Sequence, residues 1–195
     1  MAHLKFDMAR LERLNDPGRF DSLPPEIFFS VLGGLDDART IVEIGAGTGL
    51  FAAAFARRAP EAIVYAADTA VEMLDWMRVN RHEVAQGRIS PVKAEETSVP
   101  LGDGIADVVY MINIHHELAD PPASYAEALR LLKPGGRLLV VDWALRDTPK
   151  GPPQEVRVSG EDLAALLRDA GFVGVAIDET TLVWHLIATA TRPNA

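Results

Sequence analysis

A glutamate followed by three alternating glycines is the part of this chain whose residue types and spacing best suit ligand binding. Residues 42–50 have the sequence VEIGAGTGL, in which Glu43 precedes Gly45, Gly47 and Gly49. Glycine lets the backbone approach a ligand closely because it has no Cβ. The glutamate can hold a cationic or amino-bearing group. The segment therefore predicts a site for a small ligand of that kind; the simpler alternative is an accidental glycine turn in an α/β protein.

The spacing of these glycines differs from that of a dinucleotide-binding turn. Such a turn has the pattern G-x-G-x-x-G, and the sixth position here is Leu50. The β-branched residues within 41–44 predict a short buried strand, and the apolar residues of 50–55 recur at helical spacing. The turn that contains Ala46 is therefore expected between a strand and the start of a helix, where unpaired backbone N–H groups are available to a ligand.

Three segments of the chain resemble motifs of one protein family. The order E-x-G-x-G-x-G at 43–49 is similar to the first motif of the class I S-adenosylmethionine-dependent methyltransferases. IADVVYMINIHHEL at 105–118 resembles the fourth-strand motif of that family, and LKPGGRLLVVD at 132–142 resembles the segment that follows it. The resemblance covers roughly residues 38–190 and implies S-adenosyl-L-methionine as the cofactor.

The alternation of apolar strands and amphipathic helices agrees with the fold that this resemblance implies. We expect an α/β protein with the Rossmann-like class I methyltransferase fold: a seven-stranded, mostly parallel sheet with helices on both faces and an antiparallel last strand. Residues 1–37 are expected to form an N-terminal helical cap segment that begins with a helix over 3–15, and 38–195 to form the methyltransferase domain. The expected strands are 41–44, 62–67, 89–94, 106–112, 137–143, 172–177 and 182–189, with a turn at 133–136.

Asp68 stands at the end of the second expected strand, 19 residues after Gly49. A carboxylate there can accept hydrogen bonds from both hydroxyls of a ribose, as in dinucleotide-binding folds. The alternative is a helix cap, since Asp68 and Thr69 precede a helical pattern over 71–77. The motif upstream favours the ribose role.

Two adjacent glutamates are candidates for the adenine end of the cofactor. Residues 94–101, AEETSVPL, resemble the family stretch G-D-A-x-x-L-P-F, whose acidic residue meets the amino group of adenine. Alignment on Pro100 gives that position to Glu95. Glu96 is the competing candidate, and the simpler alternative is that both side chains are solvated.

The end of the fourth expected strand carries Asn113, His115 and His116. The resemblance implies that residues here lie beside the methionine part of the cofactor and the acceptor, so Asn113 and His116 are pocket candidates. A histidine can accept a proton because its unperturbed pKa is about 6.5; the alternative is a hydrogen-bonded structural histidine. A zinc site is not expected, since adjacent residues point apart and motifs such as H-E-x-x-H separate their ligands by a helical turn.

The overall composition narrows the partners of the protein. Its 195 residues suit one domain with a substantial core, and a net charge of −9 with a pI of about 5.0 offers no global basic surface to nucleic acid. No apolar run approaches the roughly 20 residues of a membrane span, and the first residues lack the apolar part of a signal peptide. We therefore expect a cytoplasmic monomer or homodimer without nucleic-acid or membrane partners.

The absence of cysteine excludes disulfides, thiolate metal sites and cysteine nucleophiles. The pair His116-Glu117 is similar to that of small-molecule methyltransferases near the arsenite and quinone-biosynthesis branches. The arsenite enzymes hold their substrate with cysteines, so arsenite is excluded as an acceptor.

The function predicted from these residues is methyl transfer from S-adenosyl-L-methionine to a small-molecule acceptor. In this hypothesis Glu43 and the turn backbone hold the amino-acid part of the cofactor, Asp68 holds its ribose and Glu95 its adenine. One alternative is a cofactor-binding regulatory protein of the same fold without turnover. A less favoured alternative is a nicotinamide-dependent oxidoreductase, against which the missing sixth-position glycine counts.

Overall fold

Seven strands form one sheet at the centre of the computed structural model, which describes residues 8–194. They are β1 (Thr40–Ile44), β2 (Ile63–Asp68), β3 (Ile89–Lys93), β4 (Ala106–Ile112), β5 (Leu132–Trp143), β6 (Val173–Asp178) and β7 (His185–Thr191). Their order is β3-β2-β1-β4-β5-β7-β6, and β7 alone runs antiparallel to the other six strands. The predicted mostly parallel sheet with an antiparallel last strand is therefore confirmed.

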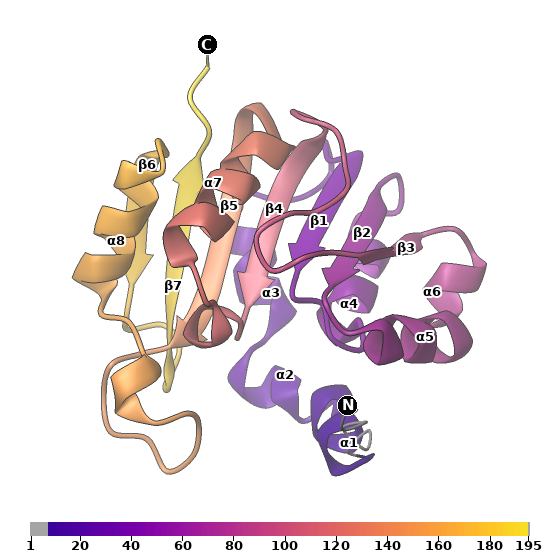
Figure 1. The fold of residues 1–195 in the computed structure, drawn as a ribbon, viewed down its shortest axis with the longest axis horizontal. Helices are drawn as coiled ribbons and strands as arrows, with labels where there is room; N and C mark the ends of the chain where they lie inside the picture. Colours follow the sequence, from indigo (N-terminus) through magenta and orange to yellow (C-terminus); the bar gives the residue numbers. More distant parts are fainter. Residues whose placement is uncertain (1–7, 195) are drawn as a thin grey trace.

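Helices cover both faces of this sheet. They are α1 (Met8–Asn15), α2 (Arg19–Ser22), α3 (Pro25–Val31), α4 (Leu50–Arg58), α5 (Val71–Asn80), α6 (His82–Ala85), α7 (Pro121–Leu131) and α8 (Gly160–Asp169), with short 3₁₀ helices at His115–Glu117 and Gln154–Val156. In Figure 1, α7 and α8 lie in front of the sheet, and α3 and α4 lie behind it. Buried side chains join α3, α4 and α5 to one face and α7 and α8 to the other. The predicted Rossmann-like architecture is confirmed.

The strand order reverses between β1 and β4. β1 pairs with β2 on one side and with β4 on the other, so the chain leaves the middle of the sheet, builds one half, and returns to build the second. Open α/β sheets bind their ligands at the carboxyl ends of the strands beside such a point. In Figure 1, α1, α2 and the loop between β5 and α8 all lie at this end of the sheet.

Two strand boundaries differ from the predicted ones by three residues or more. The prediction that a turn at 133–136 precedes the fifth strand is wrong. β5 begins at Leu132 and continues through these residues. Leu132 pairs with Ala106, and the β4–β5 ladder then shifts register, so the glycines make an irregularity inside the strand. Residues 182–184, expected in the last strand, precede β7, which begins at His185. The four-residue helices α2 and α6 are too short to give the periodic pattern that predicts a helix.

Aromatic rings attach the N-terminal segment to α4. Phe20 meets the edge of Phe51 with ring centroids 5.5 Å apart, and Phe29 meets Phe55 in the same way at 5.0 Å. Edge-to-face pairs of buried rings add about 0.5–1.5 kcal/mol each beyond the area that they bury. These contacts hold α2 and α3 beside the helix that follows the glycine turn.

The described part of the helix expected over 3–15 is α1, and residues 3–7 lie outside the described residues. The division into a cap of 1–37 and a domain of 38–195 stays a prediction. Within residues 8–194, no helix is long and apolar enough to cross a bilayer.

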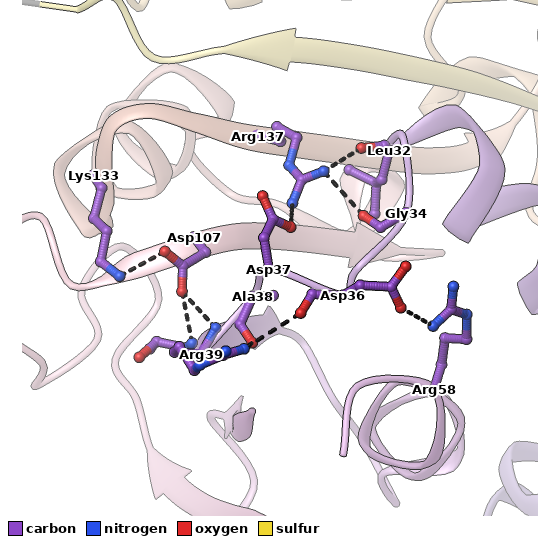
Figure 2. A network of polar contacts seen from close by, with 11 residues as sticks. Leu32, Gly34, Asp36, Asp37, Ala38, Arg39, Arg58, Asp107, Lys133 and Arg137 are labelled. Atoms are coloured by element: carbon purple, nitrogen blue, oxygen red, sulfur yellow. Dashed lines mark hydrogen bonds and ion pairs between the residues drawn. The ribbon is translucent and has the colours of Figure 1, made fainter. Parts of the chain in front are cut away.

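Figure 2 shows a polar network at the amino ends of the central strands, opposite the end where α1 and α2 lie. One carboxylate oxygen of Asp107 accepts the backbone N–H groups of Arg39 and Thr40, both at 2.8 Å, and the other pairs with Lys133 at 2.5 Å. Arg137 donates to two backbone carbonyl groups in the segment after α3. The network therefore ties β1, β4, β5 and the N-terminal segment together.

We expect Asp107→Ala to lower the free energy of unfolding by about 1–3 kcal/mol, because it leaves two backbone N–H groups without their acceptor. The matched control is Asp37→Ala. The side chain of Asp37 is 82% exposed and pairs with Arg137 at 3.1 Å, so its loss should cost at most about 1 kcal/mol. Urea unfolding followed by circular dichroism measures both, and equal midpoints for the two variants would contradict the role given to Asp107.

Candidate functional site

A cavity of about 300 Å³, here called the first cavity, lies at the carboxyl ends of β1, β2 and β4. Its walls come from the glycine turn, the ends of these strands and the segment after β3. Most of the predicted cofactor residues meet in it: Glu43, Gly45, Ala46, Gly47, Asp68, Thr69, Glu95, Glu96 and Asn113. Residues predicted from four separate segments are therefore neighbours in space.

The first and third glycines of the turn are needed for different reasons. Gly45 has a φ of +76°, and a Cβ built there would lie 2.5 Å from Ile114, so no larger residue fits. Gly49 does not line the first cavity. Its φ is +71°, and a Cβ there would lie 3.0 Å from the sulfur of Met77. The third glycine therefore allows α4 and α5 to pack closely.

Glu43 is a buried carboxyl group at the floor of the first cavity, with a relative exposure of 2%. It lies opposite Tyr110 in the β1–β4 ladder, and the Tyr110 hydroxyl donates to its Oε2 at 3.0 Å. Burial raises the pKa of Glu43 to about 8, against the opposing effects of Tyr110 and the charge of Arg19. At neutral pH the carboxyl group of Glu43 therefore holds its proton, and a cationic ligand bound beside it would favour the ionised form.

Asp68 joins the glycine turn to the segment before α5. Its Oδ2 accepts the backbone N–H of Gly47 at 2.6 Å, and its Oδ1 accepts that of Ala70 at 2.8 Å. A carboxylate oxygen has two lone pairs, so both oxygens can still accept a ligand hydroxyl. Asp68 faces the first cavity beside Thr69.

Glu95 and Glu96 both line the first cavity, and both are exposed. Glu95 pairs with Lys93 at 3.3 Å, and its backbone N–H bonds to the carbonyl of Ser98 across a tight turn. The geometry does not separate the two glutamates, so the assignment of Glu95 to the adenine stays a prediction.

A second cavity of about 540 Å³ adjoins the first. His116, Trp143 and His185 line it, together with residues of the N-terminal segment and of the loop after β5. The residues that line both cavities are Leu14, Arg19, Asn113 and Glu117. The two spaces are therefore contiguous, and the predicted residue Asn113 belongs to both.

Asn113 adopts a left-handed backbone conformation, with a φ of +57°, directly after β4. Asparagine is one of the few residues other than glycine that tolerate this region. Its N–H donates to the carbonyl of Val141 at 2.8 Å, while its side-chain Oδ1 is buried without a hydrogen-bond partner in the described chain. An acceptor atom left unpaired at the boundary of two cavities is suited to a ligand donor.

His116, which lines the second cavity and is half-buried, pairs with the buried Asp142. Nδ1 of His116 lies 2.8 Å from Oδ1 of Asp142, and the other oxygen of Asp142 accepts the N–H of His115 at 2.8 Å. Burial alone lowers the pKa of His116, but the hydrogen bond and charge of Asp142 outweigh it and raise this pKa above the ordinary 6.5. Nε2 is 3.8 Å from Oε1 of Glu117, beyond hydrogen-bonding distance.

The two adjacent histidines have different environments. His115 is buried, and its Nδ1 lies 2.6 Å from the hydroxyl of Tyr125, within the core beside α7. Burial lowers the pKa of His115, so it has the features of a structural histidine. Within residues 8–194, no group of three or more histidine, aspartate or glutamate side chains is placed to hold a metal ion.

Several polar residues of the two cavities were not predicted from the sequence, and four of them have buried or charged side chains that a ligand could contact. Arg19 and Thr48 line the first cavity, and Thr48 Oγ1 is buried without a partner in the described chain. Lys150 and His185 line the second. Thr48 lies within the glycine motif at 43–49, but no local motif marks Arg19, Lys150 or His185, because tertiary packing brings α2, the loop after β5 and the start of β7 to the site.

We expect Glu43→Gln to flatten the pH dependence of stability. In the native state the pKa of the Glu43 carboxyl group is about 8, against an ordinary value of 4.5. As pH rises, the unfolded chain therefore loses this proton at a lower pH than the native state does. Native stability should therefore fall as pH rises from about 5 to 8, and Glu43→Gln should gain roughly 1–4 kcal/mol over the wild type across that window. Urea unfolding at pH 5 and pH 8 measures this difference; parallel curves for the two proteins would contradict it.

Comparison with known proteins gives matches in both sequence and structure. A profile of the methyltransferase domain family matches residues 42–140. An uncharacterized methyltransferase of Mycobacterium tuberculosis is 32% identical over 142 residues, covering 72% of this chain and 54% of that protein. The ubiquinone/menaquinone biosynthesis C-methyltransferase of Dinoroseobacter shibae is 30% identical over 113 residues, covering 57% and 45%. The chain thus spans about half the length of the curated relatives that it matches.

A crystal structure supports the same relationship over nearly the whole chain. A SAM-dependent methyltransferase from Aquifex aeolicus superimposes with a TM-score of 0.86 at 28% identity, covering 96% of this chain and 100% of that one. Family profile, relatives and fold agree with the motifs at 43–49 and 132–142. The chain therefore belongs to the family of class I S-adenosylmethionine-dependent methyltransferases.

Proposed function

We propose that this protein binds S-adenosyl-L-methionine in the first cavity and methylates a small molecule bound in the second. The observation that carries the proposal is the contiguity of the two cavities at Asn113, which lines both. A methyl donor on one side and an acceptor on the other would meet there. The second cavity has the volume of an ordinary small-molecule site, which is typically about 300–1,000 Å³.

The polar groups of the first cavity suit each part of the cofactor. The buried Glu43 and the glycine turn would hold its amino-acid part, and the carboxylate of Asp68 its ribose hydroxyls. The buried and unpartnered Oγ1 of Thr48 and Oδ1 of Asn113 are further hydrogen-bonding atoms for which a polar ligand would supply partners. When bound, the cofactor supplies an electrophilic methyl carbon whose bond to sulfur breaks, with the electron pair left on sulfur, as the acceptor atom bonds to it.

The chain has to align the acceptor and take up a proton if the acceptor is a hydroxyl group. Alignment of two reactants can lower a barrier by roughly 7–11 kcal/mol. His116 is the proposed proton acceptor: its Nδ1–H would donate to Asp142, which leaves the lone pair of Nε2 to receive the hydroxyl proton. Asp142 fixes the ring and stabilises its protonated form. Asn113 would border the methyl group, where the two cavities meet.

We expect the protein to bind S-adenosylhomocysteine at micromolar levels and Asp68→Ala to bind it at least about tenfold more weakly, because the variant loses the ribose acceptor. Asp75→Ala is the matched control, since Asp75 lies on α5 with a 65% exposed side chain and pairs only locally with Arg78. Isothermal titration calorimetry measures all three proteins. If the wild type binds neither this ligand nor S-adenosyl-L-methionine, the proposed function is wrong. Tight binding without product from any acceptor class would favour a regulatory protein instead.

The His116–Asp142 pair predicts an order of histidine titrations. The pKa of His116 should lie above 6.5 and that of His185, lowered chiefly by burial, near 4. Asp142→Asn should lower the pKa of His116, because it removes the adjacent charge. Long-range ¹H–¹⁵N NMR of histidine-labelled protein measures these values, with His116→Gln to assign the signal and the exposed His82→Gln as the control. A pKa for His116 that does not respond to Asp142→Asn would exclude the proposed pairing.

A further inference from the structure

We infer that the second cavity takes an acceptor with a negative charge besides the hydroxyl group that is methylated, such as a small hydroxylated carboxylic acid. This inference rests on the proposed function, since it names the class of molecule bound at that same site. It is carried by an unpartnered buried histidine, by the charges that surround it, and by the apolar wall beside it.

His185 is a polar side chain whose hydrogen bonds are not satisfied within the described chain. Its relative exposure is 1%, and neither Nδ1 nor Nε2 has a partner. A neutral imidazole has one N–H donor and one acceptor nitrogen. A buried polar group that stays unpaired costs about 1–3 kcal/mol, so a ligand atom that accepts from this N–H recovers part of that cost. Because His185 lines the second cavity, that atom belongs to a molecule bound there.

The charges around His185 favour an anion. Arg19, Arg157 and Lys150 act on its ring as cations and lower the pKa of His185 further. Asp142 is a carboxylate that acts in the opposite direction. Asp142 is already paired with His116. Arg19 is partly balanced by Glu43 and Asp16. Lys150 lies over the ring of Trp184 and Arg157 donates to backbone carbonyl groups, so these two cations, beside a neutral, buried donor, are complementary to a carboxylate.

The second cavity also has two carboxylates in its wall, Asp16 and Glu117, and Asp16 acts on Arg19. Asp16 is exposed and accepts the backbone N–H of Gly18 at 2.8 Å. Glu117 approaches Nε2 of His116 at 3.8 Å, on the side where the proton would be received. The positively charged part of the second cavity is therefore beside His185 and Lys150. The proposed proton acceptor of that cavity is His116. A hydroxy acid has a carboxylate for the positively charged part and a hydroxyl group for His116.

An aromatic ring forms part of the wall beside His185. The ring of Trp143 lies 4.3 Å from that of His185, centroid to centroid, and Arg157 lies over the Trp143 ring at 5.4 Å. Gly151 packs on the same ring, where a Cβ would come within 2.8 Å. Trp143 is thus held rigidly, and it offers an apolar surface to the carbon skeleton of the acceptor.

The test compares acids with neutral molecules of the same shape. The probes are 2-, 3- and 4-hydroxybenzoate and the corresponding hydroxybenzyl alcohols, titrated by calorimetry into the full chain with and without saturating S-adenosylhomocysteine. At least one acid should bind about tenfold or more tightly than its alcohol, and added salt should reduce that preference. Lys150→Gln, a change on an exposed loop, should reduce it by about threefold or more. His185→Asn should weaken the acid more than the alcohol.

Lys133→Gln is the matched control, because Lys133 pairs with Asp107 at the opposite end of the sheet and should leave the preference unchanged. The affinity for S-adenosylhomocysteine should also stay unchanged in Lys150→Gln. Equal binding of acids and alcohols, a preference that Lys150→Gln does not alter, or no binding of any acid to the S-adenosylhomocysteine complex would overturn the inference. Failure of S-adenosylhomocysteine itself to bind would overturn the proposed function, while selective binding of an acid to the ligand-free protein would still support an anion site.

Discussion

The reversal of strand order between β1 and β4 is the constraint on which both cavities depend. β1 ends in the glycine turn and β4 ends at Asn113, so the two segments that bound the first cavity leave the sheet side by side. Their register is equally important. Glu43 lies opposite Tyr110, which places the hydroxyl at the buried carboxyl. A slip of one residue would turn these side chains to opposite faces of the sheet, because side chains alternate along a strand.

The second cavity depends on the turn that follows β4. The left-handed conformation of Asn113 ends the strand, and its N–H still bonds to Val141 of β5, so the turn stays attached to the neighbouring strand. Asp142 then binds this turn at two places, the backbone N–H of His115 and the ring of His116. Because one carboxylate fixes both, His115 is held in the core while His116 faces the cavity. A backbone constraint thus decides which of two adjacent histidines is available for chemistry.

The sequence predicts the local parts of this site and misses the parts that arrive from a distance. A strand, a glycine turn and a helix are consecutive, so their pattern alone places the turn, and parallel strand ends meet at one edge, which brings Asp68 to it. Gly49 shows what a motif cannot predict. Its spacing is that of a ligand-binding glycine, whereas the structure shows that it gives room to the side chain of Met77. Arg19 and His185 lie outside every motif, more than 160 residues apart in the chain, and only the tertiary fold makes both of them neighbours of the second cavity.

The two cavities differ in the charge that they offer, and under the proposed function this difference sorts their ligands. The first is lined by five acidic side chains, Glu43, Asp68, Glu95, Glu96 and Glu117, whereas in the second Arg19, Arg157 and Lys150 act as cations on His185. A sulfonium cofactor with an ammonium group suits the first, and an anionic acceptor suits the second. Arg19 and Glu117 line both cavities, at the boundary between them. In such a low-dielectric site, fixed charges act more strongly than they would in water, and a ligand placed in the wrong cavity would be repelled. Orientation of donor and acceptor would then follow from the charges of the chain before any reaction takes place.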